Sequence, residues 1–184
     1  MLKLVLAVVA VWGIAVPAIA TELGDDGLHK TAWMRDTFRD LNDDLAEANS
    51  EGKRLAIIIE QRGCIYCTKM HKEVFPDPAI DKFIGDNYFF IQINMFGDTE
   101  VTDFDGETLS EKDMVRKWGV MFTPTMMFFP QEVAETAPAN KIAVVQMPGA
   151  FGKGTTLALL RWVKEKGYLG DEPFQKYLAR TLEQ

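Results

Sequence analysis

Two cysteines separated by two residues stand where a strand is expected to give way to a helix. The apolar, β-branched run 55–59 predicts a strand covered on both faces, as in a parallel sheet between layers of helices. Cys64 and Cys67 follow this strand, and residues 65–74 and 88–93 predict a helix and a second strand. A CxxC at the start of a helix, inside a strand–helix–strand unit, is typical of a redox site.

The position of each cysteine on the expected helix predicts its role. Cys64 stands at the helix N-terminus, where unpaired N–H groups and the helix dipole favour a thiolate. Arg62, Lys69 and Lys72 add positive charge around the motif. Cys67 lies one turn later on the same helix. We therefore predict Cys64 as the attacking thiolate and Cys67 as the buried resolving thiol.

The motif has three other interpretations. A purely structural disulfide would close a very short loop and constrain the unfolded chain little. A metal-binding chaperone that uses Cys64, Cys67 and His71 is the sharper alternative, because His71 stands four residues after Cys67 and hence on the same helix face. A non-catalytic scaffold that binds a partner through a helix at 31–49 and the acidic segment 94–108 is the third.

The first 20 residues predict a cleaved secretory signal. Lys3 precedes an apolar stretch at 4–16, and Pro17 and a small-x-small site ending at Ala20 follow it. An uncleaved membrane anchor would need about 20 unbroken apolar residues, and the break at Pro17 disfavours it. We therefore expect the protein in the periplasm, where disulfides persist.

Residues 21–184 are expected to form a single domain. The whole chain of 184 residues is 47% hydrophobic, which is ordinary for a globular protein. Its formal net charge of -7 excludes the basic surface that nucleic-acid binding requires. Segment 94–108 carries five Asp or Glu and no Lys or Arg, and is expected to be an acidic surface insertion.

Hydrophobic periodicity and capping signals predict the remaining elements. Asp77 is a plausible N-cap, with Pro78 at the first helical position after it. Besides those named above, helices are expected at about 31–49, 77–85, 110–118, 155–166 and 173–181, and strands at 125–129 and 141–147. The last two strands are expected to pair antiparallel.

Thr123 and Pro124 lie directly before the expected strand at 125–129. A CxxC at a helix start, followed some way along the chain by Thr-Pro before a strand pair and a helix, resembles the thioredoxin superfamily. The resemblance spans most of residues 53–167. It implies an α/β thioredoxin fold, with a central mixed sheet of four, or five, strands flanked by helices. The helices expected at 31–49 and 173–181 add an extra N-terminal helix and a short C-terminal one. The resemblance also implies that Pro124 is cis and faces the cysteines, and that a partner's chain lies along the Thr123 backbone.

The motif itself is similar to a narrower group. Residues 60–67 with Phe75 and the Thr-Pro-Thr at 123–125 are similar to secreted SoxS/SoxW-type thioredoxins of bacterial sulfur oxidation. We expect a monomeric enzyme that needs no cofactor. The similarity implies that it reduces disulfides of partner proteins, such as a carrier protein of sulfur oxidation. It also implies recharging by a membrane electron donor of the CcdA/DsbD kind.

Two further residues near the motif have two interpretations each. Glu60, four residues before Cys64, is either solvated or accepts the proton of Cys67 during resolution. Tyr66 is either a surface ring or a cover for the disulfide.

Overall fold

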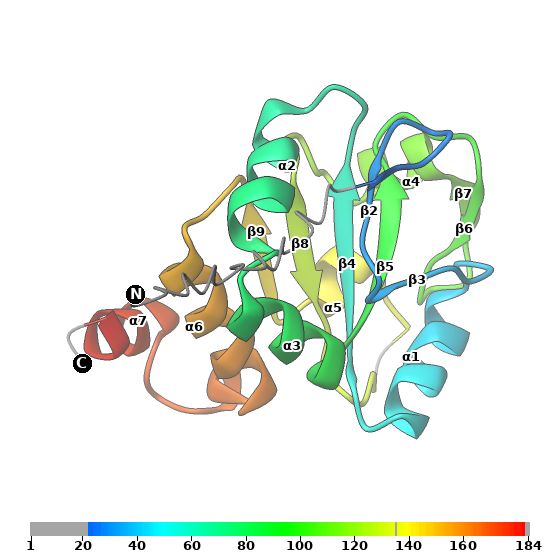
Figure 1. Cartoon of the computed structure of the whole chain (residues 1–184). Helices are drawn as coiled ribbons and strands as arrows, with labels where there is room; N and C mark the ends of the chain where they lie inside the picture. Colours follow the sequence, from blue (N-terminus) through cyan, green and yellow to red (C-terminus); the bar gives the residue numbers. More distant parts are fainter. Residues whose placement is uncertain (1–21, 135, 183–184) are drawn as a thin grey trace, which may run out of the picture.

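A five-stranded mixed sheet forms the centre of the molecule (Figure 1). The computed structural model describes residues 22–134 and 136–182. The strands lie in the order β3–β5–β4–β8–β9, with β3 and β4 parallel to β5, and with β8 antiparallel to both β4 and β9. Their bounds are β3 Met34–Arg35, β4 Arg54–Glu60, β5 Tyr88–Asn94, β8 Thr125–Phe128 and β9 Val145–Pro148. The expected mixed sheet is confirmed in its five-stranded form.

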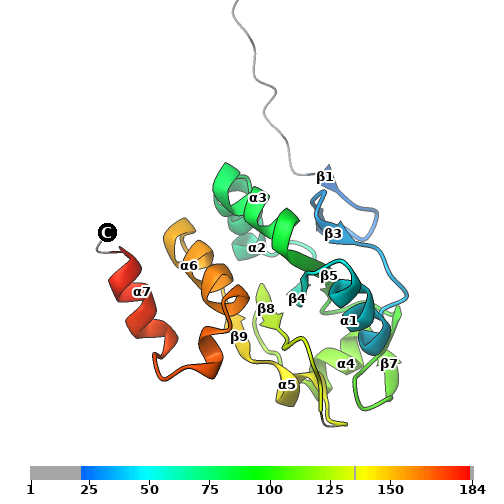
Figure 2. The same ribbon diagram turned by 90° about the horizontal axis from the view of Figure 1, so that it is seen from below.

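Helices cover both faces of this sheet (Figure 2). One layer holds α2 (Ile65–Lys69), the π-helix η1 (Met70–Val74), α3 (Pro78–Asn87) and α6 (Lys153–Lys164), and the other holds α1 (Leu41–Ser50), α4 (Glu111–Lys117) and α5 (Ala139–Ile142). The side chains of β4 alternate between the two cores, since Ile58 packs on the α3 side and Ile57 and Ile59 on the α1 side. Both faces of β4 are therefore buried, as its continuous apolar run predicts.

The strand–helix–strand unit around the cysteines is confirmed. Strand β4 ends at Glu60, α2 begins at Ile65 and continues directly into η1, and β5 returns parallel to β4. Asp77 caps α3, its carboxylate accepting the Ala79 N–H at 3.1 Å. The last expected helix is also present as α7 (Phe174–Leu182), after the short 3-10 turn η2 (Gly167–Leu169).

The helix expected at 31–49 is wrong in its first half. Helix α1 begins only at Leu41, after Arg39 at a φ of 57° and an N-cap at Asp40. The carboxylate of Asp40 accepts the N–H groups of residues 42 and 43, which fixes the start of the helix. Residues 34–35 form β3 on the edge of the sheet instead, and Phe38 is fully exposed.

The acidic segment 94–108 is not merely a solvated surface insertion. It contains β6 (Glu100–Thr102) and the start of its antiparallel partner β7 (Thr108–Ser110). Asp103 is fully buried between them, where its carboxylate accepts the indole N–H of Trp118 at 2.9 Å and the Ala139 N–H at 2.9 Å. The segment is therefore anchored to α4 and α5 through one buried carboxylate.

The expected strand at 141–147 is also corrected. Its first residues belong to α5, and pairing with β8 begins only at Val145 in β9. The antiparallel arrangement of β8 and β9 is confirmed. The expected signal segment 1–20 lies outside the described residues. Within the described ranges, no helix has the length and apolar character needed to cross a bilayer.

A short hairpin precedes the sheet. Strands β1 (Glu22–Leu23) and β2 (His29–Lys30) pair antiparallel. The hairpin does not join the five-stranded sheet, but it places His29 and Lys30 beside β5, where both contact Gln92.

Candidate active site

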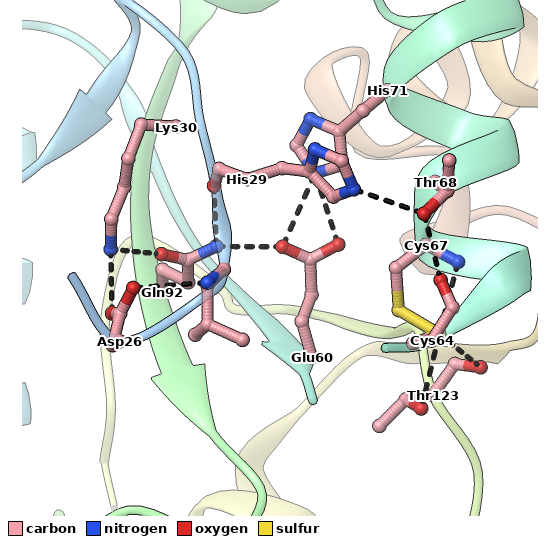
Figure 3. Close-up of polar contacts among 11 residues, drawn as sticks. Asp26, His29, Lys30, Glu60, Cys64, Cys67, Thr68, His71, Gln92 and Thr123 are labelled. Atoms are coloured by element: carbon pink, nitrogen blue, oxygen red, sulfur yellow. Dashed lines mark hydrogen bonds and ion pairs between the residues drawn. A yellow bond between two sulfur atoms is a disulfide. The ribbon is translucent and has the colours of Figure 1, made fainter. Parts of the chain in front are cut away.

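Cys64 and Cys67 are joined in a disulfide at the start of α2 (Figure 3). Their Cα atoms lie 5.2 Å apart. Cys64 is the N-cap of the helix, and the Cys67 backbone N–H donates to Cys64 Sγ at 3.0 Å. Once the bond is reduced, this N–H is placed to stabilise a thiolate on Cys64. Cys67 is the more deeply buried of the two, at 1% exposure against 6%.

Thr123 contacts the outer sulfur from the loop before β8. Its hydroxyl donates to Cys64 Sγ at 3.4 Å, and its carbonyl oxygen lies 3.5 Å from the same sulfur. The peptide bond between Thr123 and Pro124 is cis. The structure therefore brings together four of the residues singled out from the sequence, namely Cys64, Cys67, Thr123 and Pro124.

Four exposed apolar side chains flank the disulfide in the chain. Ile65 and Tyr66 directly follow Cys64, and Met121 and Phe122 directly precede Thr123. Their exposures are 74%, 58%, 77% and 62%, which is unusual for side chains of this size. We call these four residues the apolar rim. Tyr66 belongs to it, with more than half of its surface open to solvent.

Glu60 lies buried at the end of β4, at 1% exposure, so the interpretation of Glu60 as a solvated residue is wrong. Its two carboxylate oxygens lie 3.0 and 3.2 Å from His71 Nε2, and one of them also accepts from Gln92 Nε2 at 2.6 Å (Figure 3). A buried carboxylate needs such donors because it has lost its water. Figure 3 shows this group on the Cys67 side of the disulfide, whereas Thr123 lies on the Cys64 side.

His71 does not join the cysteines as a metal ligand. It is fully buried, and its Nε2 is engaged by Glu60. Among residues 22–134 and 136–182, no three His, Cys, Asp or Glu side chains are arranged to hold a metal ion. The geometry therefore overturns the three-ligand set of Cys64, Cys67 and His71 on which the metal-chaperone alternative depends.

Three residues of the site were missed in the sequence. Gln92 interrupts the apolar strand β5 and lies opposite Ile58 of β4, so a lone amide in a buried strand is a signal for a buried polar partner. Thr68 donates its hydroxyl to the Cys64 carbonyl at 3.1 Å. His29 reaches Thr68 from the distant β1–β2 hairpin, and nothing in its local sequence indicates this contact.

Known proteins share the fold of this chain. Residues 41–139 match the family described as "Thioredoxin-like domain". A thioredoxin-fold protein from Helicobacter pylori aligns with a TM-score of 0.55 and 16% identity, over 72% of this chain and 86% of that one. A thioredoxin from Thermus thermophilus aligns with a TM-score of 0.53 and 20% identity, over 70% of this chain and 86% of that one. No protein of curated function matches the chain.

The fold and the cysteine pair define a thioredoxin-type redox protein. The chain belongs to the thioredoxin-like domain family, whose match covers more than half of its length. A CxxC pair at disulfide distance on this fold supports thiol–disulfide oxidoreductase activity in general.

Proposed function

We propose that this protein is a periplasmic reductase of protein disulfides that works through Cys64 and Cys67. One observation carries the proposal. Cys64 Sγ accepts hydrogen bonds from the Cys67 N–H and the Thr123 hydroxyl, and residues of the apolar rim are its neighbours in the chain. Cys67, in contrast, is almost completely buried. This arrangement gives one sulfur that meets a partner and one that resolves the product.

The cycle transfers two electrons from the dithiol to the partner's disulfide. The Cys64 thiolate attacks one sulfur of that disulfide, forming a mixed disulfide and releasing the other sulfur as a thiolate. Cys67 then loses its proton and attacks Cys64 Sγ. This step restores the Cys64–Cys67 bond and releases the second partner sulfur, and the two departing thiolates take up protons.

Glu60 is proposed as the acceptor of the Cys67 proton. It is a carboxylate on the Cys67 side of the disulfide, and both Glu60 and Cys67 are only 1% exposed, so an internal group is better placed than solvent to take the proton. Its hydrogen bonds to His71 and Gln92 hold the carboxylate in place and spread the charge that it carries.

The sequence supports the proposed location and partners. The segment 1–20 has the pattern of a cleaved secretory signal, which favours the periplasm. The similarity of the motif to SoxS/SoxW-type thioredoxins favours a carrier protein of sulfur oxidation as substrate and a membrane donor of the CcdA/DsbD kind. Arg62, Lys69 and Lys72 near the motif suit an acidic partner or one with an oxyanion-modified cysteine. We expect a monomer.

Reduction of insulin by dithiothreitol, with and without the protein, tests the activity. We expect catalysis by the wild type and none by Cys64→Ser. Copper and zinc titrations of the reduced protein accompany the assay. Tight stoichiometric metal binding without catalysis would contradict the proposal.

A reduction potential measured against glutathione tests the direction of electron flow. A value near that of thioredoxin, about -270 mV, is expected for a reductase, whereas about -120 mV would make the protein an oxidant.

A further inference from the structure

The β1–β2 hairpin lies before the residues that match the family, yet it supplies a side chain to the active site. The rings of His29 and His71 are stacked, with centroids 4.6 Å apart and planes 22° from parallel. His29 Nε2 also lies 3.1 Å from Thr68 Oγ1, one residue after the buried cysteine (Figure 3). The family match begins only at residue 41.

The hydrogen bonds around Thr68 fix the tautomer of His29. The Thr68 hydroxyl has a single hydrogen, which it donates to the Cys64 carbonyl. Thr68 must therefore accept from His29, so the proton of the neutral imidazole is on Nε2. Nδ1 of His29 is buried and has no hydrogen-bond partner within the described ranges, so a second proton there would be unsatisfied.

The surroundings of His29 keep its ring neutral. Burial lowers the pKa of His29, and the nearby His71 lowers it further. The titratable and charged groups that face it are His71 and Lys72 of η1 and Glu60 of β4, of which only Glu60 favours the protonated ring. Asp26 and Lys30 of its own hairpin pair with each other.

The side-chain amide of Gln92 forms hydrogen bonds with both the β1–β2 hairpin and Glu60. Gln92 Nε2 donates both to the His29 carbonyl, at 2.8 Å, and to Glu60, at 2.6 Å. Lys30 Nζ donates to Gln92 Oε1 at 2.7 Å, which fixes the orientation of the amide. One face of the His71 ring is thus covered by His29, while Phe75 meets that ring edge-on at 5.0 Å.

We propose that His29 is a positioning residue for the Glu60–His71 pair, because its neutral ring covers His71 and keeps water from the carboxylate that receives the Cys67 proton. The inference rests on the proposed role of Glu60 and extends the active site to a segment outside the matched domain. The π-helix η1 supports it, since such turns within helices occur frequently at functional sites and this one carries His71.

The reaction of the reduced protein with dithiobis(nitrobenzoic acid) separates the two sulfur steps. Attack by Cys64 releases the first nitrothiobenzoate, and resolution by Cys67 releases the second. At pH 7 we expect His29→Ala to slow only the second release, by about tenfold, a part of what loss of a general base costs. His29→Phe keeps an aromatic cover and is expected to retain the wild-type rate. Leu23→Ala, an exposed position of the same hairpin, is the matched control.

Equal rates of the second release in His29→Ala and the wild type would overturn the inference, and so would a His29→Phe rate as low as that of His29→Ala. Slowing of both releases together would also overturn the inference, because it would indicate general disruption of the structure.

Imidazole ¹⁵N spectra of the unmodified protein give a test that needs no variant. They should show His29 neutral with the proton on Nε2 at pH 7, and a cationic ring would contradict the proposal. A wild type that shows both releases but reduces no insulin would refute the proposed function instead.

Discussion

Thr123 and Cys64 lie 59 residues apart in the chain, yet the Thr123 hydroxyl donates to Cys64 Sγ at 3.4 Å. The same sulfur accepts the N–H of Cys67. Both donors come from groups that the fold holds in place, and both favour negative charge on this sulfur. These two hydrogen bonds distinguish Cys64 from Cys67, and they indicate that Cys64 is the sulfur that attacks the partner's disulfide.

This asymmetry predicts which cysteine variant traps a partner. Cys67→Ser should accumulate a mixed disulfide on Cys64, since no second thiol lies one turn away to resolve it. Cys64→Ser should trap nothing, because Cys67 is buried. Non-reducing gels and mass spectrometry of each variant, expressed with residues 1–20, measure the adducts. Equal adducts from both variants, or none from either, would contradict the assignment of Cys64 as the nucleophile.

Glu60→Gln should slow the resolving step by about 100-fold, the low end of the general-base range. The rate of the first attack by Cys64 should not change, since the Glu60 carboxylate lies on the Cys67 side of the disulfide. Stopped-flow release of nitrothiobenzoate measures both steps. Thermal unfolding of the oxidised variant serves as the control for folding. An unchanged second release would exclude Glu60 as the acceptor.

Met121→Glu should weaken the use of protein substrates and spare small ones. Met121 is 77% exposed in the apolar rim, where burying it against a partner contributes about 1.5–3 kcal/mol. Loss of that contact would raise KM for insulin, while the rate with a small aromatic disulfide stays at the wild-type value. Met95→Glu is not a suitable control because Met95 packs on the core. Glu132→Gln, which lies outside the rim, is suitable. Equal loss with both substrates would argue against docking through the rim.

Asp44→Asn should stabilise the protein at neutral pH. Burial raises the pKa of Asp44 to about 6, with Asp40, Glu47 and Asp43 adding to the effect and a hydrogen bond from Thr37 opposing it. A carboxyl whose pKa is higher in the folded state stabilises the fold when protonated, so this stability is present below about pH 4 and is lost as pH rises through about 6. Urea unfolding at pH 4 and pH 7 should show a gain of about 1–3 kcal/mol for the variant at pH 7 only.

The regular part of the fold follows from local pattern. The apolar run of β4, the Asp77-Pro78 start of α3 and the CxxC after β4 each contain their own signal, and each appears as expected. The start of α1 was missed because the periodicity runs on past it. Pairing of β3 with β5 decides that region, and this contact joins residues more than 50 positions apart.

The acidic composition of segment 94–108 predicts surface exposure, which is wrong for Asp103. Acidic residues are usually exposed, so Asp103 carried no sign of burial. Its partners, the Trp118 indole and the Ala139 N–H, come from α4 and α5, and only the folded chain shows that they meet. The role of His29 is not predicted from the sequence for the same reason, since His29 lies about 40 positions along the chain from its contacts Thr68 and His71.

The cysteines are only three positions apart, so their bond closes a loop within a single turn of helix. Opening such a small ring releases almost no chain. Oxidised and reduced molecules should therefore have the same hydrodynamic radius and the same path of backbone through the sheet. A partner that distinguishes the two forms is then expected to do so by direct contact with the sulfur atoms and the surface next to them, because no structural change is expected far from the disulfide.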